Sequence, residues 1–310
     1  MTTSTVLTPE PVDDPVGAVP GEMVEPAGEI AHPVSGRTRR LPLSARIAAA
    51  LILALVAAAV LAPLLAPHDP LAGDTSQRLQ GLGANGHLLG TDGQGRDILS
   101  RLIYGTRPSL LSGLIPVTVA GIIGTVLGVT AGLSGRRTHG GIMRTLDVFY
   151  AFPAVILAIG ISATLGSGIS NAIIALSVVL IPPIARVAET ETSRLRQADF
   201  MDAARASGAT MPSIAIRQVL PTIAPPVVVY CTALIGLSIV FAAGLGFLGL
   251  GIAPPDPEWG LMVNDLRQYL FRAPSLALVP AMMILVVSVL FNVLGDGLRD
   301  RLDVRGEVAA

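Results

Sequence analysis

The chain has 310 residues, of which 51% are hydrophobic and 14% are charged, and its mean hydropathy is +0.66. A soluble domain carries about 25% charged residues, so the composition predicts a membrane protein. The formal net charge is −1 and no basic face stands out, which argues against a nucleic-acid partner. All 21 basic residues are arginine. Because the phosphate-binding loop of nucleotide hydrolases needs a lysine, we expect no such loop in this chain. We also expect the chain to be no enzyme and to carry no cofactor.

The first 45 residues differ from the rest of the chain. Residues 1–40 are rich in proline, threonine and acidic residues and show no repeating apolar face, a composition typical of disordered segments. We therefore predict a disordered cytoplasmic tail at 1–45. It is not expected to be a signal peptide, because the next apolar stretch starts too late and is too long.

Six apolar stretches are long enough, or nearly so, to cross a bilayer as helices, which takes about 20 residues. They are 47–66, 110–133, 148–165, 172–187, 225–250 and 276–294. The expected fold class is therefore all-α, a polytopic membrane protein with six transmembrane helices. The predicted parts are a first transmembrane helix at 46–67, an extracytoplasmic loop with an interfacial helix at 68–108, a core of five helices at 109–296 and a cytoplasmic tail at 297–310.

Arginine placement predicts the orientation. With the N-terminus in the cytoplasm, 15 arginines lie in predicted cytoplasmic segments and 6 in extracytoplasmic ones. The positive-inside rule therefore predicts that both termini are cytoplasmic. Acidic residues and arginines avoid the span centres, whereas ion-coupled transporters commonly use buried ionisable residues. The sequence therefore argues against an ion-coupled secondary transporter, which is kept only as an alternative function.

Small and polar residues within the spans allow two interpretations. Hydroxyl groups fit either hydrogen bonds between helices or the lining of a polar path; they belong to Thr118, Thr125, Ser162, Ser177, Thr232 and Ser288. Gly124, Gly128 and Gly132 form one small helix face, which predicts close helix packing. GLGFLG at 244–249 resembles a dinucleotide-binding loop in its glycines, but no strand precedes it, so we expect packing or a flexible helix end there.

The histidines and the cysteine predict no metal site and no internal disulfide. His32, His68, His87 and His139 lack the spacing of metal ligands along the sequence. Cys231 is the sole cysteine and is expected to be a small core residue.

A polar segment, DAARASGATMPSIAIRQVLP at 202–221, lies between the fourth and fifth apolar stretches. Residues 189–206 favour a helix, and Gly208 suits a left-handed helix end. Thr210 and Pro212 fit the start of a second, short helix, which is expected to stop before Pro221. The small side chains near the corner suit docking in a partner's groove, and the arginines equally suit a helix lying on lipid head groups. These small side chains belong to Ala203, Ala204 and Ala206.

The same segment resembles the EAA loop of ABC importer permeases, E-A-A-x3-G-x9-I-x-L-P. Asp202 stands in place of the usual glutamate and Gln218 in place of the usual isoleucine. The positions that carry the resemblance are Asp202, Ala203, Ala204, Gly208, Leu220 and Pro221. We refer to residues 188–222 as the coupling loop, because in this family the loop couples the permease to its ATPases.

Three further segments, 87–110, 246–263 and 295–303, resemble the dipeptide/oligopeptide/nickel permeases of the C type. The resemblance covers about residues 45–305 and implies the type I (MetI-like) permease fold. The extracytoplasmic segments suit docking of a binding protein, with Asp92, Gly95, Arg96, Asp97 and Trp259 as candidate contacts. The alternative is that Arg96 and Asp97 only cap and anchor the helix that follows.

The resemblance implies a permease subunit of an ATP-driven importer in a bacterial plasma (inner) membrane, working by alternating access. Its implied partners are a second homologous permease, two ABC ATPase subunits and an extracytoplasmic solute-binding protein. Dipeptides and oligopeptides are the expected solutes, with nickel or another small solute as the alternative. A membrane scaffold would need no EAA loop, and the spans lack the motifs of an intramembrane enzyme.

Overall fold

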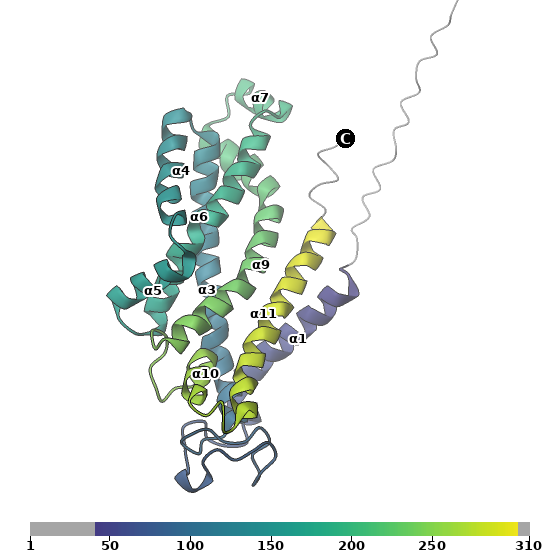
Figure 1. Cartoon of the computed structure of the whole chain (residues 1–310). Coiled ribbons are helices and arrows are strands. Elements are labelled where there is room, and N and C mark those ends of the chain that lie inside the picture. The colour runs from purple at the N-terminus through teal and green to yellow at the C-terminus, as the bar shows by residue number, and fades with distance from the viewer. Residues whose placement is uncertain (1–40, 303–310) are drawn as a thin grey trace, which may run out of the picture. The chain divides into compact units, whose positions relative to one another are not determined.

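The computed structural model describes residues 41–302, and the named elements in this range are all helices (Figure 1). Residues 1–40 of the predicted tail lie outside the described residues. The α-helices are α1 (Leu43–Val60), α2 (Ala62–Leu65), α3 (Ile98–Leu133), α4 (Arg136–Tyr150), α5 (Ala154–Leu165), α6 (Ile169–Leu195), α7 (Asp199–Ala206), α8 (Met211–Ile214), α9 (Leu220–Phe247), α10 (Trp259–Arg267) and α11 (Pro274–Leu302). The all-α prediction is confirmed.

Five helices are long and apolar enough to span a membrane, and a bent pair brings the number to as many as six. The five are α1, α3, α6, the continuous helix Met211–Phe247 and α11. They correspond to five of the six predicted apolar stretches, and four of them are longer than the stretch itself. α1 ends at Val60, before the predicted end at 66, and α9 ends at Phe247, before the predicted end at 250. α3 begins at Ile98 and α6 continues to Leu195, so both helices extend beyond the apolar residues from which they were predicted.

The predicted stretch 148–165 does not form one helix. α4 ends at Tyr150, α5 begins at Ala154, and the two helices are bent by 87° at the break. Pro153 explains the break, because a proline disfavours the helical conformation of the residue before it, here Phe152. The third stretch is therefore either one broken span or a re-entrant segment.

α3 and α6 pack along the glycine face predicted from the sequence. A Cβ atom added at Gly124 would lie 3.0 Å from the backbone nitrogen of Ala185, and one at Gly132 would lie 2.7 Å from Thr192 Cβ. At Gly128 an added Cβ would overlap the carbonyl oxygen of Ala185. Glycine is therefore needed for the close approach of the two backbones, and the prediction of close packing is confirmed.

The short helix after the glycine corner does not stop before Pro221, so that prediction is wrong. Residues Ala215–Val219 form a π-helical turn and lead directly into α9, in which Pro221 lies in the first turn. The Leu220 N–H donates to the carbonyl of Ala215, one residue beyond the α-helical partner. This shift in hydrogen-bond register lets the chain continue past a proline that would otherwise break the helix.

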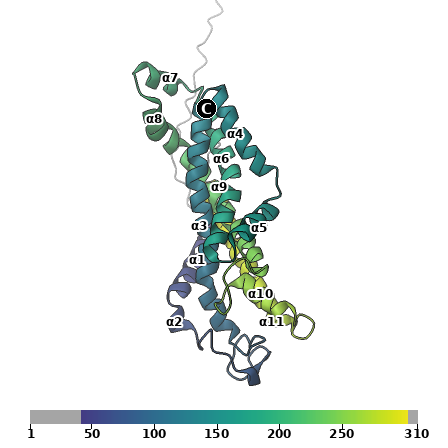
Figure 2. The same cartoon turned by 90° about the vertical axis from the view of Figure 1, so that its left-hand side faces the viewer.

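The first and last spans lie side by side. A Cβ atom added at Gly297 in α11 would overlap Cβ of Ala45 in α1, so the start of the first span and the end of the last lie together. Figures 1 and 2 show α7 toward this end of the helices, while α10 and the loop between α2 and α3 lie at the other end.

Candidate functional site

The coupling loop begins as a continuation of α6 and is then interrupted. α6 ends at Leu195, residues 196–198 leave the helix, and α7 begins at Asp199. The single helix predicted over 189–206 is therefore wrong at this point. Ala198 is extended, with φ −78° and ψ 141°, and the resulting turn buries Met201 completely in a hydrophobic core beneath α7.

Gly208 forms the corner of the loop, as predicted. Its φ of +79° lies in the left-handed region, which glycine adopts without the penalty of a Cβ atom. The Gly208 N–H donates to the carbonyl of Arg205 at 3.0 Å, and the Ala209 N–H donates to that of Ala204 at 3.1 Å. These bonds satisfy the carbonyls at the end of α7 in the manner of a Schellman motif. Pro212 then lies in the first turn of α8.

The residues of the EAA-like motif fall on two sides of the loop. Asp202 and Ala203 are exposed, whereas Ala204 is 8% exposed and packs in the core beneath α7. Leu220 and Pro221 are also exposed. The sequence suggested that all the small side chains near the corner could meet a partner, but the structure turns Ala204 inward.

Buried residues tie α7 to the long helices. Met201 and Ala204 of α7 share one hydrophobic cluster with Ile184 of α6, Val129 of α3 and Ile223 of α9. Beyond the corner, residues 211–247 form one continuous helix. The cluster thus packs α7 directly against these three helices.

The opposite end of the helices is formed by residues 66–101 and 246–273, which we call the loop layer. Asp92 Oδ2 lies 2.6 Å from Arg96 Nε and 3.6 Å from Arg101 Nε, and Asp265 Oδ2 lies 3.4 Å from Arg96 Nη2. The side chains of Arg96, Arg101 and Asp92 are at most 5% exposed. Two arginines and two aspartates thus compensate one another, which buried charges require.

The residues predicted to contact a binding protein lie inside this layer. Asp92, Arg96, Asp97 and Trp259 are between 0% and 3% exposed. Asp97 caps α3, accepting a hydrogen bond from the backbone N–H of Ser100 at 2.7 Å, and the Trp259 indole donates to the carbonyl of Leu102 at 3.2 Å. This burial and these hydrogen bonds fit the alternative stated in the sequence analysis, in which Arg96 and Asp97 anchor the start of α3.

Gly95 and Gly246 allow close approach within the layer. Gly95 has a φ of +78° and lies against the backbone of Asp74. At Gly246 an added Cβ would overlap the carboxylate of Glu258. The glycines of GLGFLG therefore include a packing position, as expected. A nucleotide loop is not formed, because Gly246 lies inside α9.

Glu258 is a buried acid that the sequence did not single out. Its carboxylate caps α10, accepting hydrogen bonds from the N–H groups of Gly260 at 2.8 Å and Leu261 at 2.9 Å. Burial raises the pKa of Glu258 above its usual value, despite the hydrogen bonds that lower it. Burial also acts to raise the pKa of Asp97, but there the hydrogen bonds from Ser100 and His87 outweigh it and lower the pKa.

The fold and the coupling loop define a class: the polytopic permease subunits of ABC importers. The chain belongs to the family described as "binding-protein-dependent transport system inner membrane component", whose model matches residues 124–305. The chain is therefore a multi-pass inner-membrane permease and not itself an ATPase. Membership of this family implies ATPase and binding-protein partners.

Two relatives and one solved structure show which members of the family the chain resembles. The chain is 44% identical over 220 residues to a glutathione transport system permease protein of Pectobacterium atrosepticum, covering 71% of this chain and 73% of that one. It is 45% identical over 228 residues to a dipeptide transport system permease protein of Alkalihalophilus pseudofirmus, covering 74% and 75%. Among solved structures, a chain of the MetNI methionine ABC transporter in an inward-facing conformation matches with a TM-score of 0.56 and 20% identity, covering 67% of this chain and 97% of that one. This last match confirms the predicted fold.

Proposed function

We propose that this permease imports small peptides, and that the exposed face of α7 receives the force of ATP binding and hydrolysis from an ABC ATPase. The single observation that carries the coupling role is the two-sided coupling loop. Its outer face bears exposed Asp202 and Ala203, and its inner face is packed against three long helices. A partner bound to the outer face therefore acts on the helices directly, through Met201 and Ala204.

The proposed assembly contains a second homologous permease, two ATPase subunits and a solute-binding protein. The orientation follows from the arginines, which favour cytoplasmic termini and a cytoplasmic coupling loop. The loop layer then lies outside and faces the binding protein. Because Asp92, Arg96, Asp97 and Trp259 are buried, we propose that they fix the shape of the docking surface from beneath.

The substrate proposal rests on the relatives. They are glutathione and dipeptide permeases by name, with identities of 44% and 45%, and glutathione is itself a small peptide. Nickel or another small solute is the alternative within the same importer type. An ion-coupled mechanism has less support, because it would favour ionisable residues near the span centres.

Co-purification tests the assembly. The tagged chain is extracted in mild detergent and the proteins that accompany it are identified by mass spectrometry. The expected result is an ATPase with a phosphate-binding loop together with a second permease. Recovery of the chain alone, even after crosslinking, would contradict the importer assembly.

Uptake tests the substrate. Cells lacking this chain are compared with cells carrying it for uptake of a labelled dipeptide, of glutathione and of nickel. We expect loss of uptake of one or both peptides and unchanged nickel uptake. Loss of nickel uptake alone would replace the peptide proposal by its alternative.

A further inference from the structure

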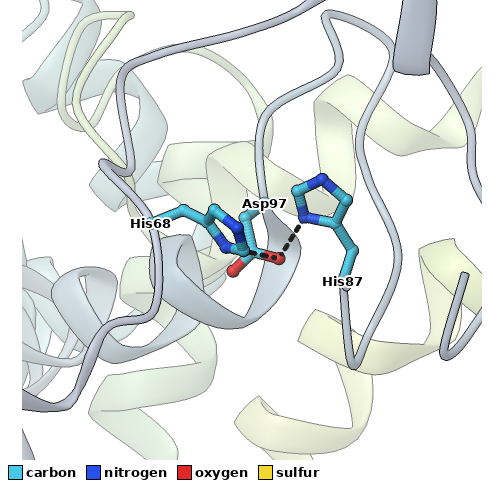
Figure 3. Close-up of side chains that lie close together, drawn as sticks. All are labelled: His68, His87 and Asp97. Carbon is cyan, nitrogen blue, oxygen red and sulfur yellow. Dashed lines mark hydrogen bonds and ion pairs between the residues drawn. The ribbon is translucent and has the colours of Figure 1, made fainter. Parts of the chain in front are cut away.

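Two histidines far apart in the sequence meet in the loop layer. His68 follows the first span, His87 lies in the loop before α3, and Asp97 caps α3. Figure 3 shows the two imidazoles on either side of the Asp97 carboxylate. Nδ1 of His87 lies 2.8 Å from Oδ1 of Asp97, and Nδ1 of His68 lies 3.8 Å from the same oxygen. Two imidazoles and a carboxylate are among the ligand types that zinc binds.

The three candidate ligand atoms are close enough to share one ion, since one atom from each residue lies within 4.8 Å of the others. Zinc bonds to histidine nitrogen and carboxylate oxygen are about 2.0–2.2 Å long, so ligand atoms around a tetrahedral ion lie about 3.4 Å apart. The observed 2.8 Å and 3.8 Å distances lie on either side of this value. A tetrahedral site would require the His68 imidazole to move toward Oδ1 of Asp97 and the His87 imidazole to move slightly away from it.

The Asp97 carboxylate is held with one oxygen directed at the histidines. Oδ2 accepts hydrogen bonds from the backbone N–H and the hydroxyl of Ser100, both at 2.7 Å. Oδ1 is left to the two imidazoles. The arginines of the layer are compensated by Asp92 and Asp265, and within residues 41–302 the ion-pair partners of Asp97 are His68 and His87. A buried carboxylate in this setting favours a cation.

The supporting contacts are those expected around a metal-binding histidine. Nε2 of His87 lies 3.1 Å from Oε1 of Gln77, and a histidine that donates its second N–H to an oxygen presents the other nitrogen to a metal. A metal ion bound here would take the place of the proton that Nδ1 of His87 otherwise donates to Oδ1 of Asp97 at 2.8 Å. The His68 backbone is fixed as well, because its N–H donates to Ser100 Oγ at 3.0 Å.

The site is also accessible from one side. The side chain of His68 is 43% exposed and lines a cavity of about 620 Å³ that is also bordered by Asp69, Tyr104 and Asp256. This cavity gives an ion access to the His68 imidazole and has room for water as a fourth ligand. A site formed by these residues would be a three-ligand centre with one open position.

We propose that His68, His87 and Asp97 bind one divalent transition-metal ion of the zinc type, which clamps the loop after the first span to the start of α3. The sequence predicted no metal site, because its histidines lack ligand spacing. The fold supplies the proximity that the spacing does not.

Zinc binding to the purified full-length chain tests the proposal. The chain carries an affinity tag without histidine, is stripped with a chelator, and is titrated with Zn²⁺ against a chromophoric zinc indicator. We expect one ion per chain with a Kd below about 1 µM. His68→Ala is expected to weaken binding on the order of 100-fold, and Gln77→Ala by about tenfold, as for supporting contacts elsewhere. His139→Ala, a histidine outside the cluster, is the matched control and should bind as the wild type does.

A second readout separates ligation from loss of structure. His87 is buried, so its replacement risks unfolding, whereas the side chain of His68 is 43% exposed and its variant should elute as the wild type does in size-exclusion chromatography. Zn²⁺ should raise the unfolding temperature of the wild type and of His139→Ala, but not of His68→Ala. Equal zinc affinity in the wild type and His68→Ala, or no binding in this range by the wild type, would overturn the proposal.

Discussion

The loop layer and the coupling loop lie at opposite ends of the same helices and are stabilised in opposite ways. In the loop layer, Asp92, Arg96 and Arg101 are buried and compensate one another. The ion pair of α7 in the coupling loop, Asp202 with Arg205 at 3.0 Å, is exposed to solvent. One end is thus held together by buried ion pairs, while the ion pair at the other end lies on an exposed face.

Buried and exposed ion pairs differ in how much they contribute to the free energy of unfolding. Removing one partner of a buried ion pair costs about 3–5 kcal/mol, because the remaining charge stays buried without compensation. An exposed pair three or four residues apart on a helix contributes only about 0.2–0.5 kcal/mol. The loop layer is therefore expected to limit the stability of the chain, and the coupling loop its activity.

The largest effect is expected for Asp92→Ala in the loop layer. The substitution leaves Arg96 and Arg101 without their nearest carboxylate, so we expect a loss of about 3–5 kcal/mol and a marked fall in unfolding temperature. The measurement is thermal unfolding of the detergent-purified chain. Asp92→Asn, which keeps an acceptor for the backbone N–H of Arg96, should lose less. An unfolding temperature equal to that of the wild type in Asp92→Ala would show that the layer does not limit stability.

Gly208→Pro in the coupling loop should abolish uptake instead. Proline fixes φ near −65°, whereas Gly208 has a φ of +79° and donates its N–H to the carbonyl of Arg205. Proline where the native φ is incompatible and the N–H was hydrogen-bonded destabilises by more than about 1 kcal/mol, enough to displace α7 while the long helices remain folded. We expect uptake to fall at least tenfold at unchanged abundance in the membrane.

The matched control at the same position is Gly208→Asn, because asparagine tolerates the left-handed region better than other residues with a side chain. It should retain most of the uptake. Normal uptake by Gly208→Pro would remove the corner from the coupling mechanism.

A smaller effect is expected on the pH dependence of stability, and it arises from Glu258 in the loop layer. Because burial raises the pKa of Glu258 above the usual 4.5, the folded state binds its proton more tightly than the unfolded state does. The stability that this proton contributes is fully present below pH 4.5, and it is lost as the pH rises through the raised pKa. Unfolding temperatures of the wild type and Glu258→Gln, measured from pH 4 upward, should therefore differ in slope. Parallel curves would contradict this reading of Glu258.

Local sequence patterns predicted much of the fold. The apolar stretches located the long helices, Gly128 and its neighbours predicted the close contact of α3 and α6, and Gly208 predicted the corner. Each of these signals depends on neighbours along one helix or on the conformational freedom of one residue. Pro153 also indicated the break between α4 and α5, but a prediction that only counts apolar residues does not take the proline into account.

Features created by tertiary contacts could not be predicted in this way. Trp259 follows a proline-rich stretch and is expected from the sequence to be an exposed loop residue, yet it is completely buried in a core that it shares with α3, α9 and α11. The inward side of Ala204 depends on the break before α7, and the meeting of His68 with His87 depends on the path of the whole loop. None of these has a periodic pattern that would identify it from the sequence alone.

The smallest effect on stability, and the sharpest test of the comparison, is expected from Asp202→Ala. Its ion pair with Arg205 is exposed, so the unfolding temperature of the isolated chain should change by less than the equivalent of about 0.5 kcal/mol. If the outer face of α7 meets an ATPase, the carboxylate gains its partner only in the assembly. Uptake and co-purification of the ATPase should then fall in Asp202→Ala, while Asp202→Glu, which restores the length usual in this motif, retains both. If Asp202→Ala loses stability as well as uptake, Asp202 stabilises the fold of the chain itself. The coupling loop would then depend on its ion pair for stability, as the loop layer does, although the pair is exposed.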